Sequence, residues 1–269
     1  MRLVSLFAVL GLGLAACGPA PQTVNLASPS VPAVYQARTD TGPNGAPINI
    51  PAIRAAYLTE RNQRQRVAYN GPEAPGTIVV DPYARVLYDV MENGEAMRFG
   101  VAVGRAGKGF SGDAVISLKK QWPSWTPTQN MIRTEPDLYG QFAGGLSGGV
   151  DNPLGSRALY LYRNGRDTYY RIHGTMDPSS IGKATSAGCI RLFNQDVMDL
   201  FDKTELGTRV KVRSQAESVR LEGPMIETPE GYVVPASEAG ALAPQAAAAT
   251  LVAAEPGFVS PVESAVPSR

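Results

Sequence analysis

Two side chains in this sequence could carry out nucleophilic chemistry together. The chain contains one histidine, His173, and two cysteines, Cys17 and Cys189. His173 ends a run typical of a β-strand, and Cys189 closes the loop that follows, so the imidazole and the thiol can come within hydrogen-bond reach. A free thiol is mostly protonated near neutral pH, and a nearby imidazole can raise its ionised fraction. The pattern predicts a Cys189 nucleophile with His173 as its base.

The residues around this pair form two ordered motifs. The first is His173-Gly174-Thr175, and the second is Ser186-Ala187-Gly188-Cys189-Ile190-Arg191. Together they resemble the signature of the L,D-transpeptidase catalytic domain. The likeness extends to the segments at residues 104–107, 122–125 and 152–155, and covers about half of the chain.

This resemblance implies a role for each matching position. Cys189 is the nucleophile and His173 the general acid and base, while the backbone carbonyl of Gly174 orients the second ring nitrogen. The backbone N–H groups of Gly188 and Cys189 are the expected oxyanion donors. Many family members carry a second histidine where this chain has Ala187, so any help from that side chain in orienting the substrate is in doubt.

Four further side chains are expected at the substrate site. Arg191 either binds a substrate carboxylate or braces its loop, and the sequence favours neither role. Ser186 is placed beside it by the resemblance. Trp122 and Trp125 stand in an irregular segment, and aromatic side chains there either line a groove or fill a core; the sequence slightly favours the groove.

The resemblance implies acyl transfer on the stem peptides of peptidoglycan. The Cys189 thiol would form a thioester, and an amine from another stem peptide or from an envelope protein would then accept the acyl group. An L,D-carboxypeptidase or cross-link hydrolase would use the same acyl-enzyme and admit water. A third alternative is not an enzyme: the chain could be a non-catalytic lipoprotein that binds peptidoglycan.

The net charge and the residue composition argue against nucleic-acid binding and against a zinc site. Lys and Arg number 25 against 24 Asp and Glu, which gives no electrostatic case for nucleic acid. A single histidine without a His-x-x-x-His or Cys-x-x-Cys spacing gives no case for zinc. We therefore expect neither a metal nor a cofactor.

Short alternating segments predict the fold class. Strands are expected at residues 77–80, 85–90, 96–103, 158–162, 168–173 and 208–212. A helix capped by Asn194 is expected after the nucleophile loop. Residues 104–157 read as one long irregular stretch. The expected fold is mainly β, an L,D-transpeptidase-type β-sandwich of mixed strands with one or two short helices.

The N-terminal region predicts export. Residues 1–16 have the build of a signal peptide, and the segment that ends at Cys17 resembles the lipobox of bacterial lipoproteins. We therefore expect Cys17 to carry lipid and to anchor the chain to a membrane on the periplasmic side of the cell envelope. Composition predicts a flexible tether at residues 17–52.

The remaining boundaries follow from changes in composition. Residues 53–75 are expected to form a short helix and a lead-in, in which residues 53–69 form one basic helix with either a solvated or a lipid-contacting face. Residues 76–213 form the expected catalytic domain. Residues 214–269 are rich in Ala and Pro and are expected to be disordered.

Overall fold

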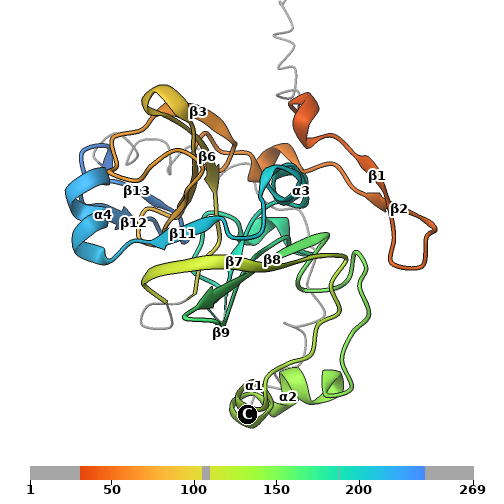
Figure 1. Cartoon of the computed structure of the whole chain (residues 1–269). Coiled ribbons are helices and arrows are strands. Elements are labelled where there is room, and N and C mark those ends of the chain that lie inside the picture. Colours follow the sequence, from red (N-terminus) through yellow and green to blue (C-terminus); the bar gives the residue numbers. More distant parts are fainter. Residues whose placement is uncertain (1–30, 105–109, 187, 240–269) are drawn as a thin grey trace, which may run out of the picture. The chain divides into compact units, whose positions relative to one another are not determined.

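The computed structural model describes residues 31–104, 110–186 and 188–239, and Figure 1 shows their elements. Most of these elements are strands, which lie in three sheets. The strands are β1 (Arg38–Thr41), β2 (Pro47–Ile50), β3 (Gln65–Ala68), β4 (Ile78–Asp81), β5 (Val86–Val90), β6 (Glu95–Gly100), β7 (Gly112–Gln121), β8 (Arg157–Arg163), β9 (Arg166–His173), β10 (Ile190–Arg191), β11 (Arg209–Val212), β12 (Met225–Glu227) and β13 (Val233–Pro235). The α-helices are α1 (Gln129–Thr134), α2 (Pro136–Tyr139), α3 (Asn194–Lys203) and α4 (Gln215–Glu222), and the 3-10 turns are η1 (Ala33–Tyr35), η2 (Ala55–Tyr57), η3 (Glu92–Gly94), η4 (Gly140–Phe142) and η5 (Pro178–Ser180).

One nine-stranded mixed sheet forms the centre of the fold. Its strand order is β10-β9-β8-β7-β11-β4-β5-β6-β3. The pairs β10–β9 and β11–β4 are parallel, and the other neighbours are antiparallel. The expectation of a mainly β fold with mixed strands and few short helices is confirmed.

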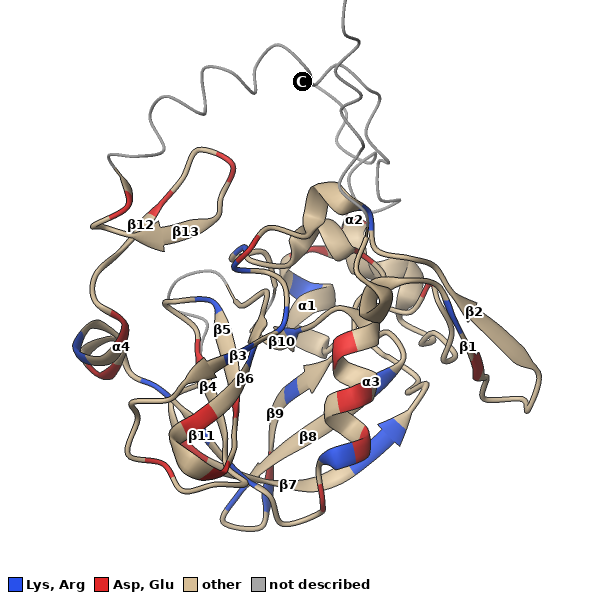
Figure 2. Ribbon diagram, turned by 90° about the horizontal axis from the view of Figure 1, so that it is seen from above, with Lys and Arg blue, Asp and Glu red and all other residues tan. Residues whose placement is uncertain are grey.

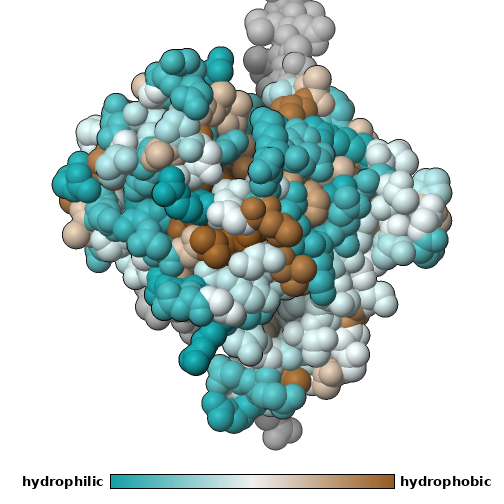
Figure 3. Space-filling model, viewed as in Figure 1, coloured by the Kyte–Doolittle hydropathy of each residue, from teal (hydrophilic) through white to brown (hydrophobic). Residues whose placement is uncertain are grey.

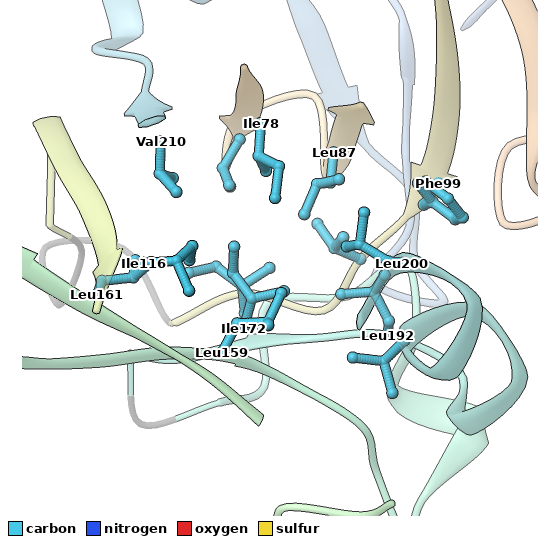
Figure 4. Close-up of a cluster of buried hydrophobic side chains, with 14 of the residues drawn as sticks. Ile78, Leu87, Phe99, Ile116, Leu159, Leu161, Ile172, Leu192, Leu200 and Val210 are labelled. Atoms are coloured by element: carbon cyan, nitrogen blue, oxygen red, sulfur yellow. The ribbon is translucent and has the colours of Figure 1, made fainter. Parts of the chain in front are cut away.

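Both halves of this sheet contribute to one hydrophobic core. Ile78 and Leu87 come from one half, Leu159 and Ile172 from the other, and Leu200 comes from α3. Figure 4 shows their side chains pointing toward one another. Burial of this apolar surface is the main favourable term in holding the sheet against α3. Figure 3 also shows apolar side chains at the surface near the middle of the face seen in Figure 1.

The six predicted strands lie within a few residues of the observed β4, β5, β6, β8, β9 and β11, but the expectation for residues 104–157 was wrong. That stretch contains β7, the longest strand, which pairs with both β8 and β11, and the short helices α1 and α2. Ile116-Ser117-Leu118 alternates, but the alternation is short, because Lys119, Lys120 and Gln121 follow in a polar run. Pairing on both sides, which local sequence does not encode, stabilises it.

The tether prediction for residues 17–52 is wrong from Val31 onward. That part contains η1 and the β1–β2 hairpin. Tyr35, Ile50 and Ile53 are almost fully buried, and Tyr35 packs edge-on against Phe193 with the ring centroids 5.6 Å apart. A few large apolar residues that are all buried can order a segment whose composition is otherwise that of a linker. Residues 17–30, including Cys17, lie outside the described residues.

Tyr35→Ala tests this packing. The side chain is 1% exposed, and its hydroxyl group accepts a hydrogen bond from the Arg64 N–H at 2.6 Å and donates one to Asp196 at 3.3 Å. We expect the free energy of unfolding to fall by about 3–5 kcal/mol, as in other large-to-small core changes. Tyr83→Ala, at a site that is 42% exposed, should change it by less than about 0.5 kcal/mol. Equal effects in urea titrations of the two variants would contradict the packing argument.

The single basic helix expected over residues 53–69 is also wrong. The segment contains the turn η2 and the strand β3. Arg64 lies largely buried, with Nε 2.8 Å from Asp196 and Nη2 2.6 Å from Asp199 of α3. Figure 2 shows the acidic positions along α3. The arginines therefore do not share one helix face, because Arg64 pairs with a distant helix.

The tail prediction fails for residues 214–239. Ser214 and Glu217 form a capping box that starts α4, as this pair of residue types favours. The β12–β13 hairpin follows, and Glu227 pairs with the buried Arg85 at 2.9 Å. Residues 240–269 lie outside the described residues. In the part that the structure describes, no helix is long and apolar enough to span a bilayer.

Candidate active site

The strands β9 and β10 bring the histidine and cysteine motifs together. They pair in parallel, with Ile190 opposite Ile172 and Arg191 opposite His173. Both isoleucines point into the core. Because successive side chains along a strand face opposite sides of a sheet, His173 and Arg191 point to the other face. Cys189 directly precedes β10, so the same alternation directs it to that face, where the backbone and charge of Arg171 act on it.

The His173 ring is buried and held by backbone. It is 3% exposed, and Nδ1 lies 2.6 Å from the carbonyl oxygen of Gly174. A carbonyl can only accept, so Nδ1 carries the proton and Nε2 is left as the basic nitrogen. Burial and then the Arg191 charge lower the pKa of His173 to about 3, although backbone groups of Gly174 and Leu154 favour the charged ring. The imidazole is therefore neutral at pH 7.

The Cys189 thiol is half-buried and faces backbone. Its Sγ lies 3.9 Å from the carbonyl oxygen of Tyr169. Burial raises the pKa of Cys189, and the backbone N–H and guanidinium of Arg171 and the guanidinium of Arg191 only partly oppose this. Within the described residues, no hydrogen bond joins Sγ to the His173 ring. The sequence predicts a thiol ionised by its imidazole, whereas the structure favours a neutral thiol in this state.

The Ser186 side chain makes two hydrogen bonds within the nucleophile loop. Its buried hydroxyl donates to the carbonyl oxygen of Cys189 at 2.6 Å and accepts from the Gly188 N–H at 3.1 Å. Gly188 has φ +141°, a conformation that side chains rarely allow. Ser186, expected to contact substrate, is thus engaged within the loop. The Gly188 N–H must leave that hydroxyl before it can serve an oxyanion. Ala187 lies outside the described residues.

The structure shows one of the two roles that the sequence left open for Arg191. Its backbone exchanges two 2.9 Å hydrogen bonds with Ala102 and so braces the loop. Its guanidinium is half-buried near Cys189 and Asp177, and burial lowers its pKa. In residues 31–104, 110–186 and 188–239, this guanidinium makes no hydrogen bond or ion pair. A carboxylate could therefore bind it without displacing a hydrogen bond or an ion pair, although the charge of Asp177 acts on it.

The segment that contains this site matches a known protein family. The model of the L,D-transpeptidase catalytic domain matches residues 75–212. The chain belongs to this family. The matched range agrees closely with the domain expected at residues 76–213.

Named relatives agree with this membership. A probable L,D-transpeptidase ErfK/SrfK of Escherichia coli is 34% identical over 142 residues, which cover 52% of this chain and 44% of that protein. A putative L,D-transpeptidase of Fuscovulum blasticum is 42% identical over 97 residues, or 36% of this chain and 47% of that protein. The chain therefore spans about half the length of the curated relatives it matches.

A solved structure from Brucella melitensis shows higher identity under another name. It is called a probable carnitine operon oxidoreductase, is 49% identical, and covers 57% of this chain and 96% of its own. The TM-score of 0.41 is too low for an argument from shape.

In this L,D-transpeptidase-family chain, the two tryptophans differ in environment. Trp122 is 3% exposed, and its Nε1 donates to Asp40 at 2.9 Å, so the slight preference for a groove-lining Trp122 was wrong. Trp125 is half-buried and packs on Phe142, with centroids 6.0 Å apart. Hydrogen bonding of the indole to the β1–β2 hairpin, which lies outside the matched domain, holds Trp122 inside.

Asn194 contributes to the site, although it was predicted to have another role. Asn194 was expected to cap α3, but Phe193 is the N-cap and makes no side-chain cap hydrogen bond. The Asn194 amide instead reaches the loop after His173.

Among the described residues, no group of three His, Cys, Asp or Glu side chains could hold a metal ion.

Proposed function

We propose that the protein transfers an acyl group from a peptidoglycan stem peptide through a Cys189 thioester, with His173 as general acid and base. The observation that carries this proposal is the β9–β10 pairing, in which His173 lies opposite Arg191, two residues after Cys189. Family membership supports an acyltransferase reaction. The buried ring, with Nδ1 held on the Gly174 carbonyl, supports a base at Nε2.

The neutral state of both groups defines the first step. As Sγ attacks the carbonyl that links an L-centre to a terminal D-amino acid, the thiol proton passes to Nε2 of His173. The C–N bond then breaks, the departing amine takes that proton, and the thioester remains. These steps require Sγ to leave the Tyr169 carbonyl and to approach Nε2 of His173.

The second step consumes the thioester. An acceptor amine, from a neighbouring stem peptide or an envelope protein, gives its proton to Nε2 and forms the new amide bond. The thiol then takes the proton back, so no group is consumed. The guanidinium of Arg191, half-buried near Cys189, supports recognition of a stem-peptide carboxylate.

Mass spectrometry of purified muropeptides incubated with the full chain tests this proposal. Cross-linked dimers together with a released D-amino acid are expected, as is a thioester adduct on Cys189. Trimmed stems without dimers would instead indicate an L,D-carboxypeptidase. Binding without any change in mass would indicate a peptidoglycan-binding protein and overturn the proposal.

We also propose that Cys17 carries lipid and anchors the protein on the periplasmic side of the envelope. The motif at residues 14–18, with small residues before the cysteine, supports this. Cys17→Ala is expected to move the protein from the membrane pellet to the soluble fraction and to leave its activity on soluble muropeptides unchanged. Retention of the variant in the pellet would remove the anchor.

A further inference from the structure

Asn194 forms the centre of a small buried hydrogen-bond network. It is the first residue of α3 and is 9% exposed. Its Oδ1 accepts from the backbone N–H groups of Ser156 at 2.9 Å and Thr175 at 3.3 Å, and its Nδ2 donates to the Thr175 carbonyl at 2.8 Å. One side chain therefore ties α3 to the start of β8 and to the loop after His173.

One of these hydrogen bonds involves the peptide group that holds the histidine. The carbonyl of the Gly174–Thr175 peptide accepts from His173 Nδ1, and the N–H of the same peptide donates to Asn194 Oδ1. Hydrogen bonds connected in this way orient and polarise one another. We propose that Asn194 is a positioning residue that fixes the Nδ1–H tautomer of His173 through the Gly174–Thr175 peptide.

The neighbouring backbone leaves space for this amide. A Cβ built on Gly174 or on Gly155 would overlap Asn194 Oδ1, and Gly155 also has φ +62°. The Gly174 N–H, which belongs to the preceding peptide group, donates to the Arg157 carbonyl at 3.1 Å, so the peptide groups on both sides of Gly174 are held. These restraints leave the Gly174 carbonyl one orientation, and that orientation determines which ring nitrogen of His173 carries the proton.

The adjacent residue provides a matched control. Gln195 is also a buried amide on the first turn of α3, but its Nε2 donates to the carbonyls of Gln36 and Pro51 at 3.3 and 2.9 Å. It therefore holds the N-terminal segment and makes no contact with the loop after His173. Loss of either amide should destabilise α3, and only loss of Asn194 should alter the imidazole.

The single histidine of the chain makes the test direct. With 15N-histidine, the full-length wild type should give one imidazole whose shifts report Nδ1–H and a bare Nε2 at pH 7. Asn194→Leu, which removes all three bonds at similar volume, should give a tautomer mixture. Asn194→Asp keeps the oxygen that accepts from the Thr175 N–H and, when its other oxygen is protonated toward the Thr175 carbonyl, should retain the wild-type tautomer. Gln195→Leu should lower Tm and leave the imidazole shifts unchanged.

The catalytic consequence rests on the proposed function. Asn194→Leu should slow muropeptide acylation by roughly 10- to 100-fold, as loss of an orienting partner does elsewhere, with Asn194→Asp within about fivefold of the wild type. If Asn194→Leu does not fold, Asn194→Ala serves the same comparison. A wild-type tautomer in the Leu or Ala variant would overturn the proposal, whereas an inactive wild type would overturn only the proposed function.

Discussion

His173→Ala is expected to lower the rate of product formation from muropeptides by roughly 10²- to 10⁴-fold. The structure gives the reason. Burial raises the pKa of Cys189, so the thiol is neutral and must lose its proton during the attack. His173 is the only histidine in the chain, so no other imidazole can take over. Cys189→Ala removes the nucleophile and should lose activity to at least the same extent.

The double variant distinguishes a catalytic unit from two separate contributions. If His173 acts only through Cys189, adding His173→Ala to Cys189→Ala should lower the residual rate hardly further, because members of one unit are non-additive. Released D-amino acid measures each rate, and a melting curve of each variant controls for unfolding. Losses that multiply in the double variant would show that the residues act independently and would leave Cys189 without its base.

The catalytic pair could be predicted from sequence because its signal is local. His173 ends a strand, Cys189 follows one loop later, and the parallel pairing of β9 with β10 then places them on one face. The motif could not predict whether the Cys189 thiol is ionised. The pKa of the thiol depends on burial and on the charge of Arg171, which is set by packing over the whole sheet.

The errors over residues 31–50 and at Asn194 share one physical cause. Val31–Ile50 has the composition of a linker, yet Tyr35 packs on Phe193 and Asp40 pairs with Arg157 at 2.7 Å. These contacts join residues more than a hundred positions apart, and local composition carries no trace of them. Asn194 was misread for the same reason. Its residue type fits a cap, and only the tertiary structure shows that its amide faces Thr175.

The wild-type enzyme is expected to keep its acylation rate down to pH values well below those tolerated by an ordinary histidine base. Burial and the Arg191 charge hold the pKa of His173 at about 3. The base must be neutral to accept the thiol proton, so the acidic limb of kcat/KM should follow that value. At pH 5 an imidazole with a pKa of about 6.5 would be almost fully protonated, whereas His173 should still be neutral. A midpoint near pH 6.5 would contradict the buried neutral ring.

The same shift predicts how stability changes with pH. The pKa of His173 is lower in the folded chain than in the unfolded chain, so between about pH 6.5 and pH 3 only the unfolded state binds the extra proton. Stability therefore falls as the pH decreases. From pH 7 to pH 5 the loss should be about 2 kcal/mol. His173→Gln removes this contribution and is the matched control. Asp196, whose pKa burial raises to about 7, contributes with the opposite sign in both proteins, so it cancels in the difference between them. Urea titrations in which wild type and His173→Gln lose equal stability would show that the ring is protonated in the folded protein.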